Sequence, residues 1–267
     1  MVEKIQNWLE RLQPPSRRIL LLICVIIITA MLLFWIVSYR HRALQALFSE
    51  AAGSSFHSSE ASSNAIKQLA SHKDEQSTGF LLDIATGNTQ VQLDAMRIEA
   101  INALRGREGD KVAIGLASLF QPHNGLDVRT AAAESLQSRY CSQECVLLIL
   151  HYLERISKGE QNTEDRWTRS LDPDLPDKQK KLYQMLLSIL RQQPHETVLV
   201  LRNTYGLGTA APSTFALDLS TRIGFAESCP LLLQSSQRLR KLDPELFRAP
   251  RDELQQAITS LRCNEVR

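Results

Sequence analysis

The residues with the clearest capacity for covalent chemistry are four cysteines that follow an apolar N-terminal segment: Cys141, Cys145, Cys229 and Cys263. An even set in an oxidising compartment predicts two disulfides, for which three connectivities exist. We favour Cys229 with Cys263, because this pair would join the last helices of the chain. Cys141 and Cys145 stand at i and i+4, so they can bond only if a helix begins between them. The alternative is a set of reduced, buried thiols in a cytoplasmic domain.

The sequence shows no metal-binding or catalytic pattern. Only one tight cysteine pair exists, and no histidine lies near it at the spacing of a zinc site. His195-Glu196 begins like His-Glu-x-x-His, but Leu199 takes the place of the second histidine. The acidic run at 172–177 lacks the glycine and the distal glutamate of an EF-hand. We therefore predict no catalytic residue, no metal site and no cofactor.

A polar insertion, residues 158–177, carries one aromatic side chain between two cations. Trp167 is flanked by Arg166 and Arg169, and Trp and Arg are the residues most enriched at binding hot spots. We predict that these three residues contact a partner protein. The alternative is an insertion without function, whose tryptophan packs back onto the domain.

Residues 19–37 form an uncharged apolar run, ILLLICVIIITAMLLFWIV. At about 1.5 Å per residue, a helix of this length just spans a hydrocarbon core of about 30 Å. More cations precede the run than follow it, so the positive-inside rule places the N-terminus in the cytoplasm and the long C-terminal part across the membrane. The cations are Lys4, Arg11, Arg17 and Arg18 before the run, and Arg40 and Arg42 after it. The run has few small residues and gives no dimerisation signal, so the oligomeric state stays open.

The apolar run divides the chain into four predicted regions. They are a cytoplasmic amphipathic N-terminus (1–18), a transmembrane helix (19–38), a juxtamembrane helix with a Ser-rich flexible linker (39–63), and a helical domain (64–267). A cleaved signal peptide is the alternative to an anchor, and it is disfavoured because the cations at 40–42 follow the run directly. An inverted topology would leave the domain in the cytoplasm.

The composition of the domain excludes one class of partner. Residues 1–42 hold six of the 31 basic and two of the 29 acidic residues, which leaves 25 basic and 27 acidic residues beyond them. A nearly neutral domain without a basic stripe argues against nucleic-acid binding. The remaining length is enough for a full hydrophobic core.

Short helical patterns separated by Gly, Pro, Asn or Asp dominate the chain after the linker, so the predicted class is all-α. The predicted helices cover 62–72, 77–86, 90–105, 109–120, 126–139, 142–157, 178–192, 195–205, 213–224, 228–241 and 250–263.

Two of these segments repeat with a constant offset of 32 residues. Residues 94–104 read DAMRIEAINAL and residues 127–136 read DVRTAAAESL, so that Arg97 aligns with Arg129 and Leu104 with Leu136. Each copy is followed by a second helix. Paired short helices with a period near 30 are typical of an α-solenoid, in which each repeat buries its face against its neighbours.

These copies resemble the short bacterial HEAT repeats of the phycobilisome-lyase type, over residues 90–157. The resemblance rests on the Asp-Arg entries, Asp94 with Arg97 and Asp127 with Arg129, and on the alanine-rich helices that close on leucine. It implies structural roles for these residues: the aspartate caps its helix and the arginine bridges to the neighbouring repeat. It also implies a scaffold and names no ligand.

Together these features predict a single-pass bacterial inner-membrane protein whose periplasmic helical-repeat domain binds a partner protein, as an accessory or assembly component of an envelope complex. One alternative is a tethered adaptor that faces the cytoplasm. Another is a lyase or chaperone-like factor that acts on a small molecule.

Overall fold

The computed structural model describes residues 14–52, 59–88, 93–158, 175–224, 226–241 and 248–263. All regular structure in these ranges is helical and they contain no strand, which confirms the all-α prediction. The observed helices match the predicted segments to within a few residues at each end. Most of the predicted amphipathic N-terminus lies outside the described ranges.

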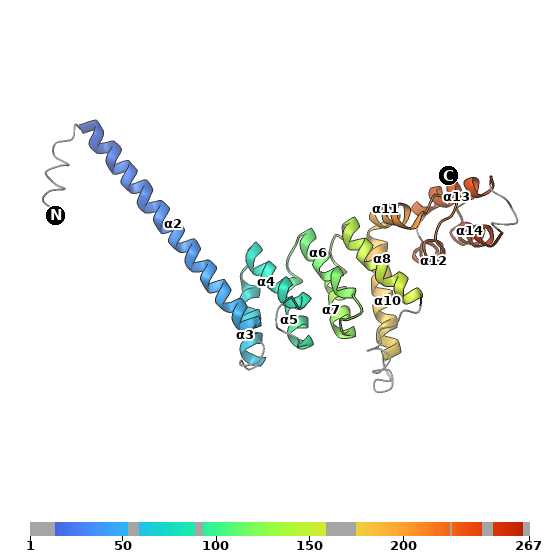
Figure 1. The fold of residues 1–267 in the computed structure, drawn as a ribbon, viewed down its shortest axis with the longest axis horizontal. Coiled ribbons are helices and arrows are strands. Elements are labelled where there is room, and N and C mark those ends of the chain that lie inside the picture. The colour runs from blue at the N-terminus through green and yellow to red at the C-terminus, as the bar shows by residue number, and fades with distance from the viewer. Residues whose placement is uncertain are drawn as a thin grey trace.

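The first described helix, α2 (Pro14–Ala52), is one continuous helix of 39 residues. Within the described residues it holds the one stretch, Val25–Ala52, that is long and apolar enough to cross a membrane by length and composition. The apolar side chains of its first half are largely exposed, and Trp35 is 65 % exposed. In Figure 1 this half stands clear of every other helix. It is therefore a candidate membrane span.

The second half of α2 belongs to the folded domain and is not a separate juxtamembrane element. Leu44 and Ala51 are buried, and α2 packs against α3 (Ser59–Ser71) and α4 (Glu75–Thr86). Phe48 stacks on Phe80 of α4 with ring centroids 4.4 Å apart. The predicted juxtamembrane helix is observed as the second half of α2, and residues 59–63, the end of the predicted Ser-rich linker, are helical. Residues 53–58 of that linker lie outside the described residues.

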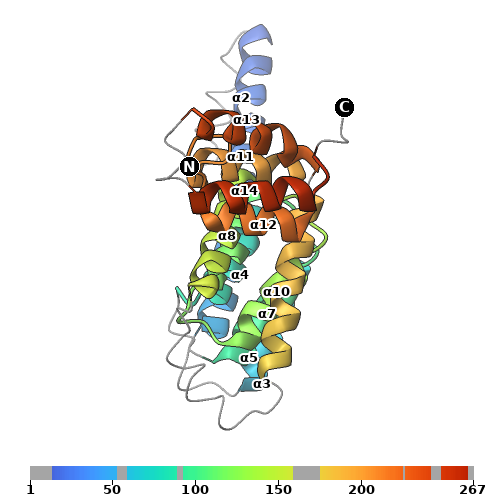
Figure 2. The ribbon, with the colours of Figure 1, turned by 90° about the vertical axis from the view of Figure 1, so that its right-hand side faces the viewer.

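The next helices form two layers, and each helix packs against its successor within the layer. The first layer runs from α3 through α5 (Asp94–Leu104) and α7 (Leu126–Leu136) to α10 (Leu175–Gln192). The second runs from α4 through α6 (Asp110–Ala117) and α8 (Gln143–Ser157) to α11 (Pro194–Tyr205), with the short helix η1 (Ser118–Phe120) after α6. Figure 1 shows the pairs side by side along the molecule, and Figure 2 views the stack from its far end.

Small residues set the close packing of both layers. Ala100, Ala132 and Ala133 are fully buried between first-layer helices. In the second layer, a β-carbon at Gly115 of α6 would lie only 2.7 Å from Leu82 Cδ2 of α4. A methyl group added at Gly115 would therefore require the Leu82 side chain to move, because interiors are packed to near-crystal density.

The C-terminal end of the chain departs from this pattern. Helix α14 (Arg248–Ser260) packs on α12 (Thr214–Ile223) and α13 (Cys229–Leu239), and the short helix η2 (Ala226–Ser228) links α12 to α13. These helices form a compact group at the end of the stack opposite α2 (Figure 1).

Candidate functional site

The predicted partner-binding residues Arg166, Trp167 and Arg169 lie outside the described residues. The structure describes the two ends of their insertion. One end is Lys158, directly after α8 of the second layer, and the other is Leu175, which begins α10 of the first layer. The two ends of the insertion therefore belong to neighbouring helix pairs within the stack, one in each layer, and not to one end of the stack.

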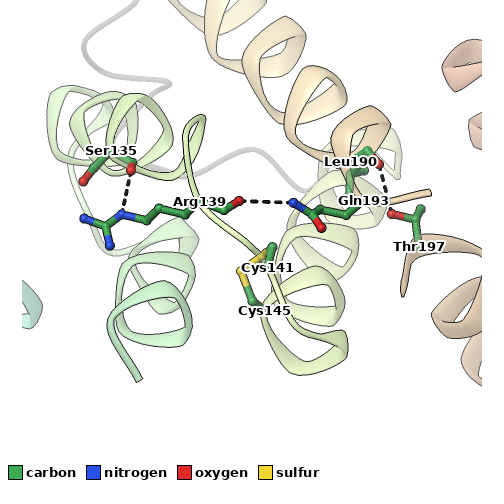
Figure 3. The surroundings of a disulfide bond; sticks show 7 residues. All are labelled: Ser135, Arg139, Cys141, Cys145, Leu190, Gln193 and Thr197. Atoms are coloured by element: carbon green, nitrogen blue, oxygen red, sulfur yellow. Dashed lines mark hydrogen bonds between the residues drawn. A yellow bond between two sulfur atoms is a disulfide. The ribbon is translucent and has the colours of Figure 1, made fainter. Parts of the chain in front are cut away.

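Both cysteine pairs lie at disulfide-bonding distance. The Cα atoms of Cys141 and Cys145 are 5.3 Å apart and those of Cys229 and Cys263 are 5.2 Å apart. Helix α8 begins at Gln143, between the first two cysteines, which is the condition set by their spacing (Figure 3). The second disulfide joins the start of α13 to the residue that follows α14 by three positions. All four side chains are buried.

Arg97 connects two successive helix pairs from a buried position. Its Nε donates to the Ala85 carbonyl of α4 at 3.0 Å, and its Nη2 donates to Asn124 Oδ1 at 2.5 Å. The side-chain amide nitrogen of Asn124, Nδ2, donates in turn to the Leu119 carbonyl at 2.9 Å. A guanidinium is suited to this place because its planar group of donors can serve several acceptors at once.

Arg129, which aligns with Arg97, is also buried but has different partners. Its Nη1 donates to the Tyr152 hydroxyl of α8 at 2.9 Å, and its guanidinium lies 5.7 Å from the centre of the same ring. Arg129 therefore ties α7 to the second helix of its own pair. The two arginines have the same sequence position in the repeat, and Arg97 reaches back to the preceding pair through the Ala85 carbonyl.

The two aspartates of the repeat do not cap their helices as the resemblance implies. The N-cap positions of α5 and α7 are Leu93 and Gly125, and neither makes a side-chain cap hydrogen bond. Asp94 and Asp127 lie inside the first turn instead, where a negative charge still interacts favourably with the helix dipole. Asp94 also forms an ion pair with Arg97 at 3.4 Å.

A repeated turn that the sequence analysis missed ends each first-layer helix. The final leucine is fully buried, and its carbonyl accepts a hydrogen bond from the amide three residues later. The four bonds are His72 N to Leu69 O at 3.2 Å, Arg107 N to Leu104 O at 2.9 Å, Arg139 N to Leu136 O at 3.0 Å, and Gln193 N to Leu190 O at 3.1 Å.

The side chains at the third residue of these turns form a ladder along the stack. Arg107 Nη2 donates to the carbonyls of Leu69 and Ala70 at the end of α3, at 3.2 and 2.9 Å. Arg139 donates to the carbonyls of Leu104 and Arg107 at the end of α5.

Gln193 continues the ladder after the insertion, because its Nε2 donates to the Arg139 carbonyl at 3.2 Å (Figure 3). Each of these side chains thus donates to carbonyls near the end of the neighbouring first-layer helix, where backbone groups lose part of their helical hydrogen bonding. The carbonyls of Leu69 and Leu104 accept this bond in addition to the one within their own turn. The signal in the sequence was Leu-x-x-Arg at 104–107 and 136–139, with the same offset of 32 as the repeat already noticed.

A second polar cluster fixes α2 to the start of the stack. Arg40 Nη2 lies 2.7 Å from Asp74 Oδ2, and the Gln76 amide nitrogen lies 2.7 Å from His41 Nδ1. Burial raises the pKa of the Asp74 carboxyl, but its hydrogen bonds from the Ser77 amide and from Arg40 outweigh this and lower the pKa below the usual value. We call the contact region of Arg40, His41, Asp74 and Gln76 the anchor junction.

A groove of about 660 Å³ opens at the anchor junction between α2 and α4. It adjoins a second groove of about 540 Å³ along the start of α6, and Asp74 and Glu75 line both. Among the described residues, no group of three or more His, Cys, Asp or Glu side chains could hold a metal ion.

Comparisons with known proteins add no assignment to this geometry. The chain matches no protein-family model, no curated protein and no solved structure.

Proposed function

We propose that this chain is a membrane-anchored scaffold of the HEAT-like α-solenoid type that binds a partner protein. It would serve as an accessory or assembly component of a bacterial envelope complex. The observation that carries this proposal is the hydrogen-bonded ladder of Arg107, Arg139 and Gln193. It gives successive helix pairs one repeated contact with their neighbours, as expected for stacked repeats.

The ladder supports four stacked pairs where the sequence pattern supported two. The pairs are α3 with α4, α5 with α6, α7 with α8, and α10 with α11. The last pair follows the insertion and lacks the Asp-Arg entry, yet its turn at 190–193 has the same buried leucine and the same backbone hydrogen bond. We infer that the insertion interrupts the sequence repeat without interrupting the stack.

Three features support an inner-membrane anchor with the stack in the periplasm. The exposed apolar half of α2 has the length and composition of a span, the flanking cations favour a cytoplasmic N-terminus, and two buried disulfides are characteristic of an oxidising compartment.

Partner binding would use Arg166, Trp167 and Arg169 of the insertion, whose two ends adjoin α8 and α10. The anchor confines the encounter to the membrane surface, which raises the effective concentration of a partner that is itself in or at the membrane. Binding then needs only a modest contact area.

Recovery of a partner complex tests the anchored-scaffold proposal. The full chain should co-purify a partner from solubilised membranes, whereas residues 40–267, exported by a cleavable signal, should lose it. The truncation keeps residues 40–52 because they are part of the core. A chimera with an unrelated transmembrane segment is the control and should retain the partner. Undiminished recovery with residues 40–267 would contradict an anchor-dependent function.

Membrane topology needs its own test, because the native cysteines are too buried to label in the folded protein. We suggest Asn203→Cys, at an exposed position of α11, in a Cys24→Ser background. A membrane-impermeant maleimide should label this cysteine in intact cells once the outer membrane is permeable. Labelling that requires cell lysis would instead favour the tethered adaptor that faces the cytoplasm.

A further inference from the structure

The turns between the two helices of each pair lie along one edge of the stack. They cover 72–74, 105–109, 137–142 and 193, and we call this the ladder edge. The first-layer helices run toward it, because Arg107 reaches the carbonyls at the end of α3 and Arg139 those at the end of α5. The second-layer helices run away from it. The opposite edge therefore holds both ends of the insertion, Lys158 after α8 and Leu175 at the start of α10.

Contacts with α2 place the ladder edge relative to the candidate span. Ser62, near the start of α3, donates to the Glu50 carbonyl, whereas Asp74, beyond the end of α3, pairs with Arg40. Helix α3 thus runs back along α2 toward the apolar run. Arg40 is the third residue after Val37, the last of that run, so the ladder edge begins about 5 Å along α2 from the end of the run. Figure 1 shows the apolar half of α2 leaving the stack on this side.

The opposite edge is separated from the ladder edge by the length of a helix. Helix α8 has 15 residues, so its end lies about 20 Å from its start at the ladder edge. Helix α6 and η1 likewise lead away from the ladder edge to His123, which is exposed at the opposite edge. If the apolar run spans the bilayer, the ladder edge lies within reach of short loops of a neighbouring membrane protein, and the opposite edge does not.

The chemistry of the ladder edge suits a protein better than a lipid surface. The groove of about 540 Å³ opens there, and Lys73, Glu108 and Asp110 are among its lining residues. Glu108 and Asp110 are exposed, and in the described part of the chain neither forms an ion pair. Exposed carboxylates are repelled by anionic lipid headgroups, whereas a loop that carries a lysine or arginine can pair with them.

We propose that the ladder edge docks an extramembrane loop of a membrane-embedded partner protein, and that a cation of this loop enters the groove beside Glu108 and Asp110. The inference rests on the proposed membrane span. It adds a contact surface to the insertion, which begins and ends at the opposite edge. It also names the class of partner, an integral membrane protein with a short basic loop on the same side of the bilayer as the stack.

Site-specific photo-cross-linking in cells that make the full chain tests this surface. The cross-linker p-benzoylphenylalanine replaces Lys73, which is exposed and lines the groove, or His123 as the control at the opposite edge. We expect the Lys73 variant to form an adduct with an integral membrane protein, at a peptide that adjoins an apolar run of about 20 residues. The His123 variant should form no adduct with that protein.

A charge reversal tests the role of the groove. Adding Glu108→Lys to the Lys73 variant should abolish the adduct, because the new cation repels the cation of the loop. Glu60→Lys is the matched control, since it reverses an exposed carboxylate near the start of α3, at the opposite edge, and it should leave the adduct unchanged.

Several results would overturn the docking surface: no adduct at Lys73, an adduct with lipid or a soluble protein alone, equal adducts from both edges, or an adduct that Glu108→Lys leaves unchanged. Carbonate extraction of the same membranes separates these results from a failure of the proposed function. A chain that resists extraction and still co-purifies its partner, but gives no adduct at Lys73, refutes only the docking surface. A chain that carbonate releases refutes both the span and the surface.

Discussion

Replacing Arg139 tests whether the ladder holds the stack together. Its guanidinium donates from Nε to the Ser135 carbonyl at 2.9 Å, and its other two nitrogens donate to the carbonyls of Leu104 and Arg107. The side chain is half-buried, and burial lowers the pKa of Arg139 while nearby Glu108 opposes this change. Removal of this side chain breaks three hydrogen bonds, two of which cross between helix pairs.

The structure allows a rough magnitude for Arg139→Gln. A hydrogen bond that involves a charged group contributes about 1.5–3 kcal/mol when well buried. Two of the three bonds cross between pairs, and partial exposure lets water replace part of each. We expect the free energy of unfolding to fall by about 2–4 kcal/mol. Arg105→Gln is the control in the same segment, because its surface ion pair with Glu134 at 2.8 Å should contribute at most about 1 kcal/mol.

Urea unfolding of residues 40–267, followed by far-ultraviolet circular dichroism, measures both variants. A chain of stacked pairs that lose their coupling should also unfold less cooperatively, so the transition of Arg139→Gln should broaden. The reasoning is refuted if Arg139→Gln and Arg105→Gln lower the stability equally, or if neither differs from the parent chain.

Three further changes probe other parts of the fold. Cys263→Ser should destabilise the chain by about 4 kcal/mol and Cys145→Ser by about 2 kcal/mol, since the 229–263 disulfide closes the longer loop; thermal unfolding would show the order, and the reverse order would contradict this explanation. Deleting residues 40–52 should expose the faces of α3 and α4 and cause aggregation that residues 40–267 do not show, as light scattering would record. Asp74→Asn should weaken the pH dependence of stability. The lowered pKa of Asp74 means that its contribution is complete above the unfolded-state pKa and is lost as the pH falls through the folded-state pKa. Urea titrations between pH 2 and 6 should therefore show a smaller acid-induced loss in Asp74→Asn, and parallel curves would exclude this role.

Helix positions were predictable because local chemistry marks their ends. Asp74 caps α4 by accepting from the Ser77 amide at 2.7 Å, and Ser213 caps α12 in the same way. Gly87 and Gly206 end α4 and α11 in the left-handed conformation that glycine adopts without strain. These signals lie within a few residues of the boundary, so one sequence suffices to read them.

Residues 59–63 were predicted as the end of a linker but are helical, and two structural uses of serine explain the difference. A Ser-rich run without apolar periodicity is typical of a flexible tether, but small side chains also allow helices to approach closely. Ser62 is buried, and its hydroxyl donates to the Glu50 carbonyl of α2 at 3.3 Å. Whether a serine lies in a tether or between packed helices depends on where α2 packs. That packing includes the stack of Phe48 on Phe80, two residues far apart in the sequence, so a local pattern could not reveal it.

The acceptors of the ladder, unlike its Leu-x-x-Arg donors, could not be predicted from the sequence for a related reason. Arg107 and Arg139 keep the repeat offset, but their bonds go to backbone carbonyls, which carry no residue identity for a pattern to record. In the next pair Gln193 takes the same role with a different side chain. Both the donor side chain and the accepting carbonyls therefore vary from step to step: Leu69 and Ala70 accept from Arg107, Leu104 and Arg107 accept from Arg139, and Arg139 accepts from Gln193.

The anchor junction and the ladder together give the proposed scaffold one mechanical property. Helix α2 is both the candidate span and a packed helix of the domain, so the stack cannot swing freely about its attachment to the membrane. Both views place α4 and α8 on the same side of the stack as the projecting half of α2, with α3 and α5 farther from it. The ladder then carries this fixed orientation from α3 to α10, past the start of the insertion. Under the proposed function, the two ends of the insertion, Lys158 and Leu175, lie at a distance from the bilayer that the protein sets, which a flexible tether could not provide.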